Sequence, residues 1–168
     1  MHKPSKTGWT SRHPALVQTL LAVVALLLGV LVYVFDRDPE RTYFLSSAFS
    51  LRDAAVPVFG ELGKHLPDFL HIYAFILLTC AVLRPGHKDL LKVVSLWLVI
   101  ELFFEIGQHP ALAPSLAGMI PPWFLNVPVL ENSAEYLLRG MFDLLDLLAI
   151  LAGAVAAFLT VRFMPAYS

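Results

Sequence analysis

The chain has 168 residues, of which 58% are hydrophobic and only 15% are charged. Soluble domains are typically about 45–50% apolar and about 25% charged. Together with a mean hydropathy of +0.71, this composition predicts a single all-α domain integral to a membrane. The formal net charge of -1 gives no indication of nucleic-acid binding, and the single cysteine, Cys80, excludes an internal disulfide.

Four segments are long and apolar enough to cross a membrane, because a spanning helix needs about 17–25 mostly apolar residues. We therefore expect transmembrane helices at residues 14–35, 66–83, 90–108 and 141–163. The first segment lacks a small-residue cleavage site after it, so it is interpreted as a retained anchor and not as a signal peptide. Asn132 and Glu135 have the spacing of a capping box, which predicts a helix from near Ser133 that leads into the fourth span.

The distribution of Lys and Arg predicts the orientation of these helices. Seven basic residues lie in the two tails or close to the short connection between the second and third segments: Lys3, Lys6, Arg12, Arg84, Lys88, Lys92 and Arg162. The two long connections, 36–65 and 109–140, hold only five. Short loops rich in Lys and Arg face the cytoplasm, so we expect cytoplasmic N- and C-termini and two extracytoplasmic loops.

The two long connections are more apolar than ordinary linkers. Residues 44–62 are expected to form a helix that lies in the membrane interface. Residues 110–128 contain five prolines together with Trp123 and Phe124, which predicts irregular chain packed at the level of the outer headgroups, where aromatic rings are favoured. Both loops are therefore expected to lie against the outer membrane surface.

Polar residues recur at helical spacing in the extracytoplasmic halves of three expected spans. They form three stripes, each on one face of its helix: Asp68 and His71; Glu101, Glu105 and Gln108; and Arg139, Asp143 and Asp146. A charge at the centre of a spanning helix costs about 2.5–3.5 kcal/mol on insertion scales, so several are rarely present without a reason. The stripes predict a ligand-binding site built from these eight residues.

Structural interpretations compete with this hypothesis. Four of the eight residues lie near helix ends and reach the interface there: Asp68, Gln108, Arg139 and Asp143. A lone histidine such as His71 is more often a hydrogen-bonded core residue than a ligand. The sequence has no His-Glu-x-x-His helix and no second histidine at ligand spacing, so it predicts neither a metal nor a cofactor. Without a nucleophile motif, catalysis would depend on His71 or Glu105 as an acid–base group.

The same stripes resemble the motifs of the VanZ-like family of small bacterial membrane proteins. That family has an aspartate and a histidine opening one span, as in Asp68-Phe-Leu-His71, and Glu-x-x-Gln closing the next, as in Glu105-Ile-Gly-Gln108. Its last span reads approximately Gly-Arg-x-Phe-Asp-x-x-Asp, to which Arg139-Gly-Met-Phe142-Asp143-Leu-Leu-Asp146 is similar. The chain departs from the family in the inverted Arg-Gly order and in Ile150, which stands where the family has asparagine.

The resemblance implies a protein of four to five helices in the bacterial inner membrane, and the founding member is linked to low-level resistance to the glycopeptide teicoplanin. The preferred hypothesis is binding of a cell-envelope lipid head group or amphiphile, such as a lipid-linked envelope precursor or a lipoglycopeptide. One alternative is an intramembrane acid–base hydrolase or transferase acting on an envelope lipid, and another is a structural or assembly protein. A proton- or cation-coupled transporter is disfavoured because the inner halves of the spans lack a polar relay. The oligomeric state does not follow from the sequence.

Overall fold

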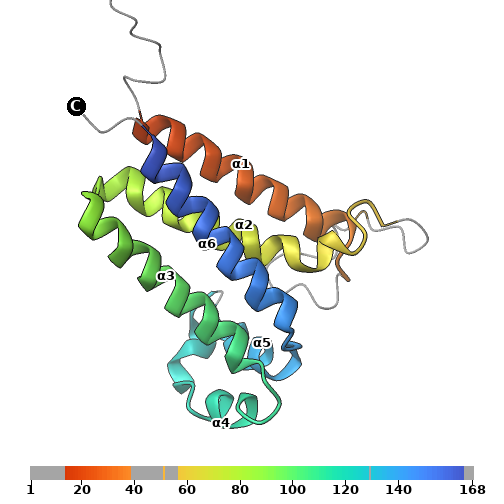
Figure 1. Cartoon of the computed structure of the whole chain (residues 1–168). Coiled ribbons are helices and arrows are strands. Elements are labelled where there is room, and N and C mark those ends of the chain that lie inside the picture. Colours follow the sequence, from red (N-terminus) through yellow and green to blue (C-terminus); the bar gives the residue numbers. More distant parts are fainter. Residues whose placement is uncertain (1–13, 39–50, 52–56, 129, 165–168) are drawn as a thin grey trace, which may run out of the picture.

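The computed structural model describes residues 14–38, 51, 57–128 and 130–164, and the structural statements below refer to that part of the chain. All of its regular elements are helices, as predicted (Figure 1). In chain order they are α1 (Pro14–Phe35), α2 (Leu62–Leu83), α3 (His87–Gly107), α4 (Ala113–Gly118), the 3-10 turns η4 (Pro122–Asn126) and η5 (Leu130–Asn132), α5 (Ser133–Arg139) and α6 (Leu144–Phe163).

Three of these helices, α1, α2 and α6, are long and apolar enough to cross a membrane. Their most apolar stretches have mean hydropathies of 2.7, 1.9 and 2.4, respectively. Helices of this length and apolarity indicate a membrane protein. α3 corresponds to the third predicted span, but it is not among the three because charged residues lie in both of its halves: Lys88, Asp89, Lys92, Glu101 and Glu105. That α3 also spans the membrane remains a prediction.

The helix bounds differ from the predicted segments mainly where the helices carry polar first turns. α1 occupies the predicted range 14–35. α2 begins at Leu62 and not at Leu66, and α3 begins at His87 and not at Leu90. Hydropathy locates the apolar part of a helix and therefore misses a first turn such as Leu62–His65. This earlier start brings His65 into α2.

The carboxylate of Asp36, directly after α1, holds the chain that leads into α2. Its oxygens accept hydrogen bonds from the backbone N–H groups of Val58 (2.8 Å), Phe59 (2.8 Å) and Gly60 (3.0 Å). Gly60 has a φ of 56°, a left-handed conformation that favours glycine. A Cβ at Gly63, in the first turn of α2, would lie only 2.9 Å from the Asp36 carboxylate. Asp36 thus ties the end of α1 to the beginning of α2.

α2 is the central helix of the bundle. It packs against α1 and α6, and α3 packs against α6 and α2 (Figure 1). One cluster of buried side chains, including Ile72, Ile76 and Ile150, joins α2, α3 and α6. A second, including Ala25 and Leu77, joins α1 and α2. The outward faces of α1, α3 and α6 carry exposed large apolar side chains, as expected for helices surrounded by lipid.

α2 and α6 approach each other closely at Gly153. A Cβ there would lie 2.5 Å from the backbone oxygen of Phe69 and 2.6 Å from a methyl group of Ile72. Small residues allow helix backbones to come this close. Ile150 and Gly153 are both buried on this face of α6. The crossing therefore determines how the beginnings of α2 and α6 lie relative to each other.

The structure corrects two predictions about the second long connection. Residues 110–128 are not irregular chain, because α4 and η4 form there, each with proline in its first turn, where a helix tolerates it. The helix expected from Ser133 forms as α5, but the Asn132 side chain does not cap it, so the capping-box interpretation is wrong. The chain then leaves the helical conformation between Gly140 and Asp143, which makes α5 and α6 separate helices.

The interfacial helix predicted for residues 44–62 lies mostly outside the described residues. Of this range the structure describes Leu51 and residues 57–62. Residues 57–61 form bends and turns that lead into α2.

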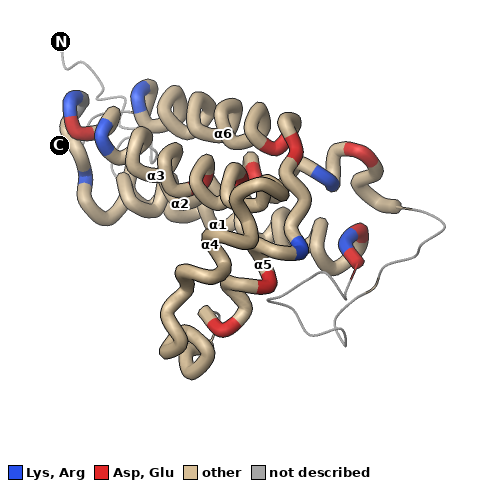
Figure 2. The backbone as a smooth tube through the Cα atoms, turned by 90° about the horizontal axis from the view of Figure 1, so that it is seen from below, with Lys and Arg blue, Asp and Glu red and all other residues tan. Residues whose placement is uncertain are grey.

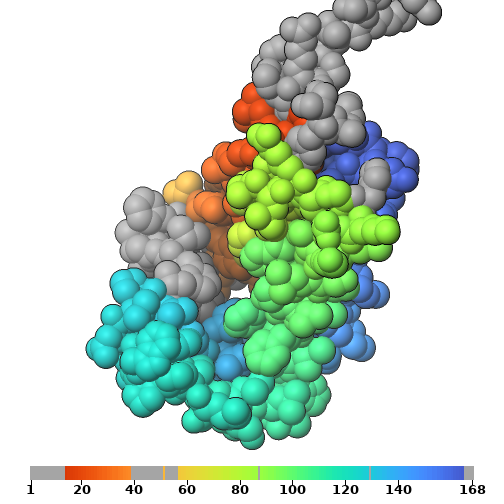
Figure 3. All heavy atoms as spheres, turned by 90° about the vertical axis from the view of Figure 1, so that its left-hand side faces the viewer, coloured from red at the N-terminus to blue at the C-terminus, as the bar shows by residue number. Residues whose placement is uncertain are grey.

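Charged residues of both signs lie at each end of the bundle, and the buried and partly buried carboxylates lie toward one end (Figure 2). Four basic residues lie at the end where α2 and α6 finish and α3 begins: Arg84, Lys88, Lys92 and Arg162. The opposite end, where α1 and α3 finish and α2 and α6 begin, carries Glu105, Asp143 and Asp146 and is called the acidic end below. Next to it, residues 108–128 and 130–139 form a lobe (Figure 3).

Candidate functional site

Glu105 links α3 to the beginning of α6. Its side chain is buried, and its Oε1 accepts a hydrogen bond from the backbone N–H of Asp143 at 2.8 Å. Asp143 is the N-cap of α6, because its carboxylate accepts a hydrogen bond from the N–H of Leu145 at 2.9 Å. These two contacts set the path of the chain into α6. They make Glu105 and Asp143, both predicted site residues, direct neighbours.

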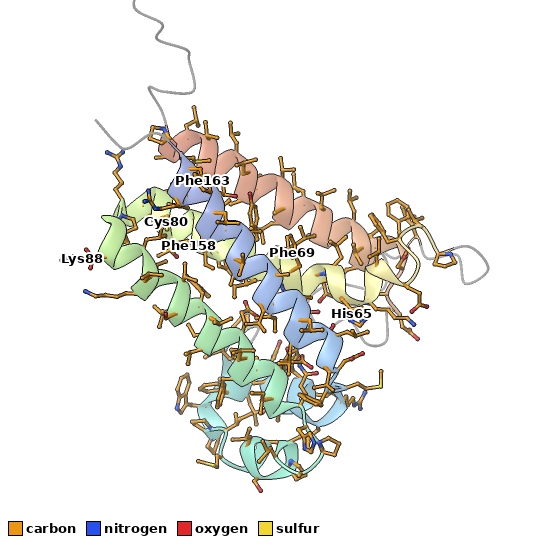
Figure 4. The ribbon with its side chains drawn as sticks, viewed as in Figure 1. His65, Phe69, Cys80, Lys88, Phe158 and Phe163 are labelled. Atoms are coloured by element: carbon orange, nitrogen blue, oxygen red, sulfur yellow. The ribbon has the colours of Figure 1, made fainter. Side chains whose placement is uncertain are left out.

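His65 contacts Asp146, an interaction that sequence reasoning missed. The Nδ1 atom of His65, in the first turn of α2, lies 2.5 Å from Oδ1 of Asp146, in the first turn of α6. Figure 4 shows His65 on the side of the molecule where α6 begins. Hydropathy had placed His65 in the loop 36–65. The sequence feature that could have revealed His65 is its spacing of three residues, or about one helical turn, from Asp68.

His65, Asp143 and Asp146 form one compact group, called the His65 cluster below. One ligand atom from each side chain, an imidazole nitrogen or a carboxylate oxygen, lies within 4.8 Å of the other two. All three side chains are partly buried. Within the described part of the chain, no Lys or Arg forms an ion pair with either aspartate.

Two predicted site residues, Asp68 and Glu101, lie deeper in the bundle. Asp68 follows the start of α2 by six residues and Glu101 precedes the end of α3 by six, which is about 9 Å at 1.5 Å per residue. Asp68 is close enough to three carboxylates, and to one cation, for their charges to act on it: Asp146, Glu105, Glu101 and Arg37. Asp68, Glu101 and Glu105 are called the inner carboxylates below.

His71 lies against α1 and apart from the carboxylates. It follows the start of α2 by nine residues, or about 14 Å, which is deeper than the roughly 8 Å expected from a start at Leu66. Its ring stacks on Tyr33 of α1 with a centroid distance of 6.5 Å, and the ring of Phe75 lies 6.0 Å away. The structure therefore places His71 in the α1–α2 interface, among aromatic rings.

Gln108, the last residue of the α3 stripe, connects α3 to α5. Its Nε2 donates a hydrogen bond to the Tyr136 hydroxyl at 2.7 Å, and its side chain packs on Gly140, where a Cβ would overlap it. Burial, followed by the negative charge of Asp68, raises the pKa of the Tyr136 hydroxyl, which therefore stays protonated. This geometry gives Gln108 a structural position between the α3 end and the lobe.

Arg139 is not on a common helical face with Asp143 and Asp146. The predicted i, i+4, i+7 stripe is interrupted because the backbone is extended at Gly140 and Asp143. Arg139 instead forms an ion pair with Glu135 at 2.8 Å, one turn earlier in α5, and both side chains are exposed. Spacing alone could not reveal this break, because it assumes one continuous helix.

The chain matches no protein-family model, no curated protein and no solved structure. What the site can bind or catalyse is therefore inferred from the chemistry of its side chains. Carboxylates accept hydrogen bonds from amines and hydroxyls and bind cations, and an imidazole adds a nitrogen ligand or a proton carrier. The structure brings six carboxylate and imidazole groups together at the acidic end: His65, Asp68, Glu101, Glu105, Asp143 and Asp146.

Proposed function

We propose that this protein is a four-span, VanZ-like protein of the bacterial inner membrane that binds the polar head group of a cell-envelope lipid or similar amphiphile at its acidic end. The observation that carries the proposal is the group of inner carboxylates, Asp68, Glu101 and Glu105. Within the described part of the chain no Lys or Arg forms an ion pair with them. Asp68 and Glu101 also receive no hydrogen bond from the described part of the chain. A carboxylate removed from water without a partner is costly, so a ligand with amine or hydroxyl donors would complement them.

The expected orientation places the acidic end at the outer leaflet. The basic residues at the opposite end favour the cytoplasmic side, and α3 then serves as the fourth span. Both termini are cytoplasmic in this arrangement. In this arrangement the acidic end faces the head groups of lipids in the outer leaflet.

In this proposal the inner carboxylates contact different parts of the ligand. Glu105 offers its second oxygen to the ligand, because Oε1 already accepts the Asp143 N–H. Asp68 and Glu101, which lie deeper, accept hydrogen bonds from the part of the head group that enters the bundle. The exposed apolar faces of α3 and α6 accommodate the acyl chains.

A second candidate function, an intramembrane hydrolase or transferase, is favoured by the contact between His65 and Asp146. A carboxylate that binds Nδ1 orients an imidazole so that Nε2 acts as a general base. This makes His65 a better candidate base than His71, which lies among aromatic rings. Turnover of an envelope lipid with a bell-shaped pH profile would support this function, and no turnover by the purified protein would count against it.

Binding of a short-chain phosphatidylethanolamine to the purified protein tests the lipid proposal. We expect saturable binding by the wild type, at least tenfold weaker binding by Glu105→Gln, or about 1.4 kcal/mol, and weaker binding of the N-acetylated lipid, which lacks the cationic amine. Native mass spectrometry would measure the affinities. Glu135→Gln is the matched control, because it neutralises an exposed glutamate of the lobe and should bind like the wild type.

The melting temperature of Glu105→Gln separates a binding role from a structural one. Glutamine retains the oxygen that accepts the Asp143 N–H and removes a buried charge, so we expect the melting temperature to hold or rise, as is common when a functional group is removed. Unchanged lipid affinity in the folded variant would remove Glu105 from the binding site. A fall of many degrees would instead show that its charge stabilises the fold.

A further inference from the structure

We propose that the His65 cluster binds a divalent transition-metal ion of the Zn²⁺ class. The ligands are Nδ1 of His65 and one carboxylate oxygen from each of Asp143 and Asp146. This inference goes beyond lipid binding and does not depend on it, because none of the three is an inner carboxylate.

The distances within the cluster suit a single small cation. Bonds from Zn²⁺ to nitrogen and oxygen ligands are about 2.0–2.2 Å long, so two ligand atoms of a tetrahedral site lie about 3.4 Å apart. The three ligand atoms already lie within 4.8 Å of one another. In the structure, His65 Nδ1 and Asp146 Oδ1 lie 2.5 Å apart and share one proton in a hydrogen bond. A metal ion replaces that proton, and the two atoms separate by about 1 Å.

Charge and donor type both favour a divalent ion with mixed ligands. Two ionised aspartates and a neutral imidazole carry two negative charges, which a divalent cation neutralises. No Lys or Arg in the described part of the chain competes by forming an ion pair with Asp143 or Asp146. Imidazole nitrogen with carboxylate oxygen is a Zn²⁺ donor set, whereas Mg²⁺ and Ca²⁺ take oxygen ligands and Cu(I) takes sulfur.

Two features of the fold position the three ligands: the crossing of α2 and α6, and the contact between Glu105 and the Asp143 backbone. The close crossing at Gly153 positions the first turns of α2 and α6, which carry His65 and Asp146. The Asp143 backbone is held by Glu105 Oε1 at 2.8 Å, a supporting contact of the kind that orients metal ligands. The side chains of His65 and Asp146 are still 22% and 15% exposed. Three protein ligands with access to solvent leave a fourth position open to water or to a polar ligand.

Titration of the chelator-treated, full-length protein with Zn²⁺, in competition with a chromophoric chelator, tests the proposal. We expect one Zn²⁺ per chain and at least tenfold weaker binding by Asp146→Asn. His109→Gln is the control, because His109 is an exposed histidine whose ring packs on Phe142, and it should bind like the wild type. Equal affinities of Asp146→Asn and the wild type would overturn the proposal.

A His65→Cys variant provides an independent readout if Asp146→Asn does not fold. The thiolate preserves a ligand at position 65, so Co²⁺ should give this variant a sulfur-to-cobalt charge-transfer absorption. The wild type should lack that band, because its single cysteine, Cys80, is buried in the core and lies toward the opposite end of α2 (Figure 4). Absence of the band in His65→Cys would overturn the metal site. Loss of lipid binding in Glu105→Gln would leave it intact.

Discussion

Asp36 accepts hydrogen bonds from three backbone N–H groups in the turn before α2, and Asp143 accepts one from the first turn of α6. Such carboxylates stabilise local chain direction. Asp68 and Glu101 receive no hydrogen bond from the described part of the chain. At the scale of single residues, Asp36 and Asp143 therefore support the local fold through backbone hydrogen bonds, and Asp68 and Glu101 do not.

Replacement of Asp36 should be among the more destabilising changes at a polar position. Asp36→Ala removes a charged acceptor from three N–H groups, so we expect the free energy of unfolding to fall by about 2–3 kcal/mol. Asp89→Ala is the control, because the pair that Asp89 forms with Lys92 is exposed, and its loss should cost less than about 0.5 kcal/mol. Denaturant unfolding in detergent micelles measures both, and equal effects would contradict the assigned role.

The contacts between helices, and not the helices themselves, create the polar site. α2 and α6 meet at a glycine, and this allows His65 to reach Asp146. α3 meets the start of α6 through Glu105. The break between α5 and α6 turns Asp143 into an N-cap and directs Arg139 to Glu135. At the scale of elements, the positions of helix ends therefore decide which side chains share the site.

Gly153→Ala should separate α2 from α6. The new Cβ would lie 2.5 Å from the Phe69 carbonyl oxygen, and a backbone atom of a packed helix cannot move aside easily. We expect a loss of about 1–3 kcal/mol, as for other overpacked sites, together with weaker Zn²⁺ binding by the His65 cluster. Gly118→Ala is the control, because no atom of the described residues beyond its chain neighbours and its own helix backbone lies within 4 Å of its Cβ position. Equal melting temperatures of the two variants would contradict the close crossing of α2 and α6.

The whole molecule combines an apolar exterior with an uneven distribution of charge. α1, α3 and α6 expose large apolar side chains along their lengths. Four basic residues, Arg84, Lys88, Lys92 and Arg162, lie at one end, and the inner carboxylates lie toward the other. The positive-inside tendency applied to this distribution gives one orientation for the whole bundle. In the orientation that we propose, α3 also crosses the membrane, because its basic start and its acidic end then lie on opposite sides.

Cysteine labelling in intact cells tests the orientation. In a Cys80→Ala background, Met119→Cys in the lobe should react with a membrane-impermeant maleimide. Lys88→Cys should react only after the cells are permeabilised. Both positions are exposed, so burial does not explain a difference between them. Labelling of both from the same side would show that α3 does not span the membrane.

The sequence by itself determined the helical class, three membrane-capable helices and the stripe on α3, because these depend on the period of one helix and on local apolarity. Glu105 and Gln108 are buried on one face of α3 as that period requires. Only the tertiary structure decided that His65 contacts Asp146, which is 81 residues away, that His71 faces α1, and that Arg139 leaves the site. These outcomes depend on how close two helices come and on where each one ends. Packing at Gly153 and the turn at residues 140–143 determine both, and neither has a periodic signal in the sequence.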